Sequence, residues 1–140
     1  MPRAALGLAP LDPARLLAEV TRPANGAEAL FVGTVREQNT GRPVTGIDYS
    51  AYDAMALAEL SRIVEAVAAE HGTPDVVCEH RVGTLAVGEA SVVVAVGHPR
   101  RDGAFAACRA VIEALKARVP IFKQEHYVDG TREWVHNGQR

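Results

Sequence analysis

Several features that mark large protein classes are scarce or absent in this sequence. Fifteen Lys and Arg residues stand against 17 Asp and Glu residues, which gives a formal net charge of −2. A chain without a positive excess exerts no overall attraction on nucleic acid, so any anion binding must come from local clusters. No apolar run approaches the roughly 20 residues that a membrane-spanning helix needs, and the N-terminus lacks the charged-then-apolar pattern of a secretory signal. These absences predict a cytoplasmic protein with neither a nucleic-acid nor a membrane partner.

Cysteine is scarce as well. Cys78 and Cys108 are thirty residues apart, and neither they nor the five histidines show the spacing of a metal site. Each cysteine has apolar sequence neighbours, which favours a buried free thiol over a reactive one. The sequence therefore predicts no bound metal and no cofactor, and a sulfur-relay role for either thiol is the alternative.

Two common catalytic motifs are also missing. The sequence holds no Gly-x-Ser-x-Gly nucleophile elbow and no Gly-x-x-x-x-Gly-Lys phosphate loop. Without an ATP site, a reaction on this chain must use a substrate that arrives already activated.

The residues that are present predict one α+β domain over residues 1–140. A chain of 140 residues with 48% hydrophobic content is long enough to bury a core. Apolar periodicity predicts helices after Asp12-Pro13 and over residues 53–71 and 102–118, and strands over residues 27–36, 44–52, 75–82, 90–97, 121–127 and 132–136. This order favours helices packed on a mostly antiparallel sheet. Residues 1–9 are expected to be a loose start, 37–43 a mobile loop and 83–89 a short connection between antiparallel strands.

Helix boundaries follow from capping residues. Asp12, Asp53 and Asp102 are each expected to serve as an N-cap, because a short carboxylate can accept a hydrogen bond from the first turn of a helix. Gly72 is expected to close the second helix, since glycine adopts the left-handed conformation at a helix end. Pro120 should stop the third helix just before it.

The most informative segment, residues 115–125, is predicted to contain the last turn of a helix, the helix stop at Pro120 and the start of a strand. Lys116 lies on its helix side and Lys123 on its strand side, so a helix that reverses into a packed strand can bring both ammonium groups to the rim of one pocket. The alternative is that Lys116 and Arg118 only complement the negative end of the helix dipole.

A second basic segment begins the same helix. Arg100 and Arg101 come directly before its N-terminus, where unpaired backbone N–H groups and guanidinium groups together favour a phosphate. The alternative is that both arginines are solvated or paired with carboxylates, and the carboxylate of Asp102 competes for the same helix end.

Helix length separates these two basic groups. A helix of about 16 residues is some 24 Å long, so its two ends cannot line one small pocket within a single chain. Either the groups are separate, or a second copy of the chain brings Arg100 and Arg101 beside Lys116 and Lys123. The second option is a symmetric dimer with a composite site. Arg36, at the end of a predicted strand, is a third candidate cation.

Five segments occur in a characteristic order between about Gly26 and Val135. They are FVGTVR (31–36), Tyr49 to Tyr52 with Met55-Ala56, HRVGTLAVGE (80–89), RDGAF (101–105) and LKARVPIFKQE (115–125). Taken together, these segments resemble the MoaE family, the large catalytic subunits of molybdopterin synthase.

The resemblance implies an α/β hammerhead-type fold and a homodimer within a heterotetramer. The partner would be a small ubiquitin-like sulfur-carrier subunit whose C-terminal Gly-Gly thiocarboxylate enters the active site. The implied reaction transfers two sulfurs to cyclic pyranopterin monophosphate, which yields molybdopterin for the molybdenum cofactor. Two rival classes are a module that docks a carrier protein without chemistry and a sensor of phosphorylated metabolites.

The resemblance also assigns roles to individual residues. Lys116 and Lys123 match the family's essential lysines, which would stabilise an oxyanion or protonate a leaving oxygen; their separate roles are not assigned. A lysine that transfers a proton needs a lowered pKa, for which Arg118 or Arg36 is the expected cause. The substrate-binding residues implied by the resemblance are Thr34, Val35, Arg36, Arg100, Arg101, Gln124 and Glu125.

Three positions depart from the family pattern. Arg100 stands where histidine is frequent, Ser50 where glutamate is common and Phe122 where tryptophan is usual. Arg100 retains a cation but not a proton-shuttling histidine, for which His98 is the expected substitute.

Overall fold

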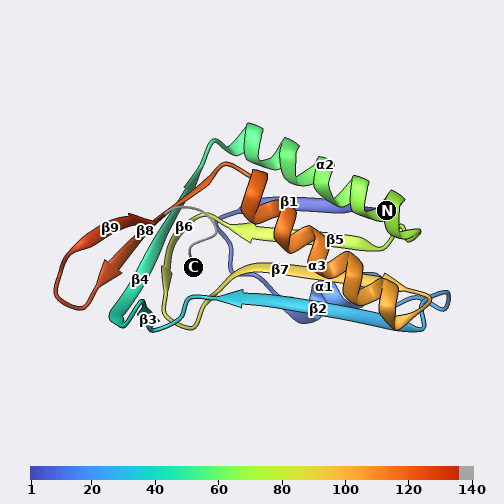
Figure 1. Ribbon diagram of the computed structural model, residues 1–140, viewed down its shortest axis with the longest axis horizontal. Coiled ribbons are helices and arrows are strands. Elements are labelled where there is room, and N and C mark those ends of the chain that lie inside the picture. Colours follow the sequence, from blue (N-terminus) through green and yellow to red (C-terminus); the bar gives the residue numbers. More distant parts are fainter. Residues whose placement is uncertain (136–140) are drawn as a thin grey trace.

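The computed structural model describes residues 1–135 (Figure 1). Within these residues the chain forms three helices and nine strands. In chain order they are β1 (Arg3–Gly7), α1 (Pro13–Val20), β2 (Ala27–Thr34), β3 (Gln38–Asn39), β4 (Arg42–Ala51), α2 (Asp53–His71), β5 (Val76–Arg81), β6 (Gly83–Ala86), β7 (Ala90–His98), α3 (Arg101–Arg118), β8 (Ile121–Tyr127) and β9 (Arg132–Val135). No helix among them is long and apolar enough to cross a membrane.

A four-stranded sheet in the order β1-β5-β7-β2 forms the larger layer. Successive side chains of its strands point to opposite faces, and helices cover both. On β5 the side chains of Val76 and Cys78 enter the main core with α2 and α3, whereas Val77 packs in a second cluster with Leu16 and Val20 of α1. Figure 1 shows α2 and α3 side by side over one face of this sheet. Burial on both faces explains why β5 and β7 contain nearly continuous apolar runs.

A second sheet in the order β3-β4-β8-β9, with β6 also paired to β4, lies at one end of the first sheet (Figure 1). Its pairs are antiparallel, as are all pairs of the first sheet except β1 with β5. Ile47 of β4, Leu85 of β6 and Ile121 of β8 join the main core. The predicted α+β architecture with mostly antiparallel strands is therefore confirmed.

Three segments that were expected to be irregular contain strands. The expected loose start contains β1, which pairs in parallel with β5 and packs Ala4 and Leu6 against the main core. The expected loop over residues 37–43 contains β3. The segment over residues 83–89 does join the antiparallel neighbours β5 and β7, as expected, but it also contains β6. Strands β1 and β6 are held by partners distant in sequence, so local patterns do not reveal them; β3 is a two-residue strand that pairs with the adjacent start of β4. The predicted last strand ends at Val135 in the structure, and His136 lies outside the described residues.

The N-caps follow the prediction at one helix of three. Asp12 caps α1, where its side chain accepts a hydrogen bond from the backbone N–H of Arg15 at 3.3 Å. The N-cap residues of α2 and α3 are Tyr52 and Arg100, not Asp53 and Asp102. Each of these aspartates lies instead in the first turn, where a carboxylate still favours the positive end of the helix dipole.

The predicted helix stops are confirmed. Gly72 follows α2 with a left-handed φ of 67°, and its backbone N–H donates to the carbonyl of Ala68. Helix α3 ends at Arg118, two residues before Pro120.

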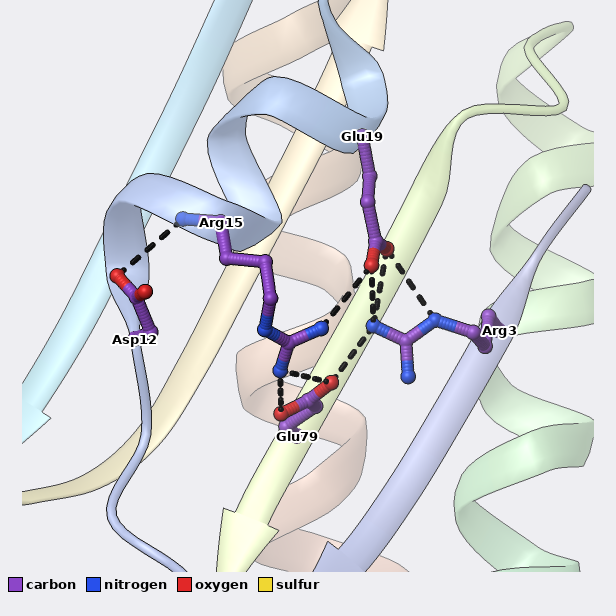
Figure 2. Close-up of polar contacts among 5 residues, drawn as sticks. All are labelled: Arg3, Asp12, Arg15, Glu19 and Glu79. Carbon is purple, nitrogen blue, oxygen red and sulfur yellow. Dashed lines mark hydrogen bonds and ion pairs between the residues drawn. The ribbon is translucent and has the colours of Figure 1, made fainter.

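An ion-pair network fixes β1 and α1 to β5 (Figure 2). Arg3 and Arg15 donate to Glu79 at 2.6 and 2.8 Å, and both also pair with Glu19 at 2.9 and 3.2 Å. Burial alone would raise the pKa of Glu79, but hydrogen bonds from the two arginines outweigh it and hold the pKa below its ordinary value. The network explains how a short N-terminal segment keeps a defined place in the sheet.

Candidate active site

The two candidate lysines lie where the two sheets meet. Helix α3 begins beyond the end of β7 and runs back along the sheet, so its last turn returns to the end at which β7 begins (Figure 1). Lys116 is in that last turn. Lys123 is the third residue of β8, only 3% exposed, on the strand face that also buries Ile121. A two-residue link, Val119-Pro120, therefore joins the elements that carry the pair.

His80 and Tyr49 lie beside the lysines. Tyr49 is directly opposite Lys123 in the β4–β8 pair, which places both side chains on the same face of the sheet. The rings of Tyr49 and His80 meet edge to face, with centroids 5.2 Å apart. Burial, with smaller contributions from the charges of Lys116 and Lys123, lowers the pKa of His80 to about 4. Both lysines are therefore close enough to this ring for their charges to act on it.

Lys116 has the electrostatics of a group that can give up a proton. It is half-buried, and burial lowers the pKa of its ammonium group. The expected cause, a neighbouring arginine, is wrong: desolvation lowers this pKa, and the guanidinium of Arg118 pairs instead with Glu59 of α2 at 2.9 Å.

The three candidate residues at the end of β2 differ in exposure. Val35 is 1% exposed; its N–H donates to the carbonyl of Glu89 at 3.0 Å, and its own carbonyl accepts from Gly88 at 2.7 Å. Thr34 and Arg36 on either side of it are exposed. Val35 thus fixes the strand end, and its neighbours carry the accessible side chains.

Gln124 and Glu125 point to opposite faces of β8 because side chains alternate along a strand. Glu125 shares the face of Lys123 but has no exposed surface. Its Oε2 accepts hydrogen bonds from Asn39 at 2.7 Å and from the Tyr127 hydroxyl at 3.0 Å. Gln124 lies on the other face, opposite Asp48 of β4. The structure therefore does not bring Gln124 to the lysines, and it places Glu125 where it supports β3.

Arg100 and Arg101 are at the far end of α3. The helix has 18 residues, which corresponds to about 27 Å. Both arginines are exposed and line a hollow with Gly26, Pro99 and Asp102. Within one chain the arginines and the lysines therefore form two separate groups, as the helix length predicts.

His98 does not serve as a proton shuttle beside Arg100. Its Nδ1 accepts the backbone N–H of Arg100 at 3.0 Å, so its Nε2 carries the hydrogen and donates to the carbonyl of His71 at 2.7 Å. Both nitrogens of this buried ring are thus engaged with the backbone. The expected substitution of His98 for the family's frequent histidine is wrong, and His98 instead holds the start of α3.

Comparison with known proteins decides the family. The sequence model of the family described as MoaE protein matches residues 6–118. This chain belongs to the MoaE family. It is 43% identical over 135 residues to the molybdopterin synthase catalytic subunit of Nostoc sp., covering 96% of this chain and 82% of the relative. It is 41% identical over 131 residues to that of Aspergillus niger, covering 94% and 73%.

A solved structure supports the fold of this MoaE-family chain. The crystal structure of molybdopterin synthase from Staphylococcus aureus matches it with a TM-score of 0.84 and 29% identity, covering 93% of this chain and 94% of that one. The fold class that the resemblance implies is thereby confirmed.

The cysteines of this MoaE-family chain are poorly suited to a sulfur relay. Burial raises the pKa of Cys108 to about 11 and raises that of Cys78 as well, so both thiols stay protonated and are weak nucleophiles. Among residues 1–135 no group of three or more His, Cys, Asp or Glu side chains has the arrangement of a metal site.

The sequence alone assigned no individual role to His80 or to Tyr49. Strand alternation offered a signal, because it puts Tyr49 on the buried face with Ile47. Asn39, which donates to Glu125, gave no sequence signal, since its segment has the composition of a loop.

Proposed function

We propose that this MoaE-family protein is the catalytic subunit of a molybdopterin synthase. It transfers sulfur from the C-terminal thiocarboxylate of a small ubiquitin-like carrier subunit to cyclic pyranopterin monophosphate. One observation carries the proposal: Lys116 and Lys123, on two adjoining elements, both lie close enough to the buried ring of His80 for their charges to lower its pKa. About 40% identity to molybdopterin synthase catalytic subunits supports the same activity.

The lysines suit a reaction at a thiocarboxylate. The thiocarboxylate sulfur first bonds to a pterin carbon and displaces an oxygen there, which gives a thioester. Water then adds to the acyl carbon of the thioester, the carbonyl oxygen carries negative charge in the intermediate, and the bond from the acyl carbon to sulfur breaks to leave a carboxylate on the carrier and the sulfur on the pterin. A buried ammonium group stabilises such an oxyanion more strongly than one in water, because the local dielectric is low. The lowered pKa of Lys116 also suits it to donate a proton to a leaving oxygen.

The phosphate is bound by cations from two copies of the chain. Arg36 extends from the end of β2, whereas Arg100 and Arg101 lie a helix length from Lys116. A homodimer that brings the arginines of one copy to the lysines of the other gives a composite site, and one carrier at each site gives a heterotetramer. Thr34 and Gln124 are the remaining proposed substrate contacts, and Val35 and Glu125 hold the adjacent backbone.

Replacement of either lysine tests the activity. Lys116→Ala and Lys123→Ala are expected to fold but to lose at least 100-fold in product formation, since each removes a charge that stabilises the transition state. The assay is mass spectrometry of the dithiolene product, with purified thiocarboxylated carrier and cyclic pyranopterin monophosphate. The matched control is Arg109→Ala, an exposed cation of α3 that pairs only with Glu113 among the interactions of residues 1–135. Normal turnover in either lysine variant would contradict the proposal.

The same assay separates the rival classes. A module that only docks the carrier, or a sensor of the pterin phosphate, binds its ligand without forming a dithiolene in the wild-type protein. The cytoplasmic location and the assignment of residues 1–140 to one domain stay predictions.

A further inference from the structure

His80 has one ring nitrogen that the fold holds and one that it leaves available. Its Nδ1 is 2.6 Å from the carbonyl oxygen of Arg81. A carbonyl only accepts, so Nδ1 carries the hydrogen and donates. In the neutral ring Nε2 then has the lone pair, and the bond to Arg81 is the only hydrogen bond of this ring among residues 1–135. The ring is therefore fixed in one tautomer with an unused acceptor.

The ring lies against the elements that carry the lysines. His80 is on the face of β5 that packs toward α2 and α3, together with Cys78 and Val76. Its edge contacts the ring of Tyr49, which is the direct cross-strand neighbour of Lys123. An ammonium group offers three donors and no acceptor, so a neutral imidazole nitrogen is its natural complement in a buried pocket.

We propose that His80 is a positioning residue for the lysine pair: its Nε2 accepts a hydrogen bond from a lysine ammonium group and directs that group toward the reacting carbonyl of the carrier. The catalytic consequence rests on the proposed function, whereas the hydrogen bond itself does not.

The charge state of the His80 ring supports its proposed role as a hydrogen-bond acceptor. Burial and the two lysines together set the pKa of His80 at about 4, so the ring is neutral and accepts at physiological pH. A protonated ring would present a third cation to Lys116 and Lys123 and could not accept.

Two substitutions of similar size separate the functions of the two nitrogens. In His80→Asn the amide can still donate to the Arg81 carbonyl, but no acceptor reaches the position of Nε2. In His80→Gln the longer side chain places an amide oxygen near that position. We expect His80→Asn to lower the pKa of one lysine by about one unit, because a hydrogen bond to the ammonium group stabilises its charged form. We expect His80→Gln to restore most of that loss.

The measurement is a pH titration of lysine side-chain Cε resonances by NMR on the full chain, with Lys116→Arg and Lys123→Arg used to assign the signals. In the sulfur-transfer assay, kcat of His80→Asn should fall about tenfold or more while KM for the pterin substrate is unchanged. Lysine titrations identical in wild type and in a folded His80→Asn variant would overturn the proposal.

A second measurement requires no change at His80. The ¹⁵N resonance of His80 Nε2 in the otherwise intact protein should have the shift of an unprotonated nitrogen, and it should move in Lys116→Met or Lys123→Met. A protonated Nε2, or a resonance unmoved by both variants, would overturn the proposal. If the wild type makes no dithiolene product, the proposed function fails, while the two NMR results still decide the role of His80.

Discussion

Glu79 joins three elements through one carboxylate. It is 7% exposed and accepts hydrogen bonds from Arg3 of β1 and Arg15 of α1, so its removal leaves these two guanidinium groups with only Glu19 as a shared partner. We expect Glu79→Gln to lower the free energy of unfolding by about 2 kcal/mol, since hydrogen bonds between charged groups contribute about 1.5–3 kcal/mol. Urea unfolding at pH 7 measures the change. Glu113→Gln, which disturbs only an exposed pair with Arg109, is the control and should have little effect.

The contribution of Glu79 should depend on pH in a definite direction. Its pKa in the folded chain lies below the ordinary value of 4.5, so its stabilising effect is fully present above pH 4.5. As the pH falls further, the unfolded chain takes up the proton first and the effect is lost. The stability difference between wild type and Glu79→Gln should therefore be constant from pH 7 to about 5.5 and shrink below 4.5. A difference that grows on acidification would contradict this account.

At the scale of residues, the sequence predicted the parts of the site that depend on local pattern. The helix stop at Pro120 was enough to place Lys116 and Lys123 on adjoining elements. The separation of Gln124 from Lys123 also follows from strand alternation, but motif resemblance grouped the two. The pairing of Tyr49 with Lys123 joins strands more than 70 residues apart, and the contact of Tyr49 with His80 joins strands of different sheets, so no local pattern encodes either.

At the scale of elements, the start of α3 depends on a glycine. A Cβ added at Gly103 would lie 2.2–2.4 Å from atoms of the His98 ring, and that ring is held by hydrogen bonds at both nitrogens. We expect Gly103→Ala to destabilise the protein by about 1–3 kcal/mol through overpacking, which exceeds the roughly 1 kcal/mol that alanine gains in helix propensity. Thermal and urea unfolding measure the change.

A double-mutant cycle provides the control for Gly103. In a His98→Ala background the obstructing ring is gone, so Gly103→Ala should become neutral or stabilising there. Equal effects in both backgrounds would show that contact with His98 is not the cause.

Elements with their own periodicity were predicted well, and elements that depend on a partner were not. Helices α2 and α3 have apolar stripes and clear stops, so their ranges were nearly right. Strand β1 is five residues long and β6 is four, which is too short for a periodic signal. Each is a strand only because β5 or β4 offers a free edge.

At the scale of the whole molecule, the separation of the two basic groups predicts complementation. Variants Lys116→Ala and Arg101→Ala should each be inactive alone. When the two are mixed and exchange subunits, half of the dimers are heterodimers, and one of their two sites then combines an intact lysine with an intact arginine from the other copy. Activity should recover to roughly a quarter of wild type at random exchange.

Complementation also distinguishes the arrangement of the site. If each site used the arginine and lysine of the same chain, every chain in the mixture would carry one defect and no activity would return. Native mass spectrometry of the mixture establishes that heterodimers have formed, so an inactive mixture that contains them would contradict the composite site.

The two-residue link between α3 and β8 limits which insertions and deletions the protein can accept, in evolution or in protein design. Because Val119 is buried and Pro120 has a fixed φ, the link has almost no freedom to absorb an added or deleted amino acid. One extra residue in β8 ahead of Lys123 would turn its amine outward and expel it from the protein interior. Insertions and deletions should therefore be tolerated at the Asn39–Arg42 hairpin tip but not at the Val119-Pro120 link. A library of single-codon insertions at both places would show the contrast directly.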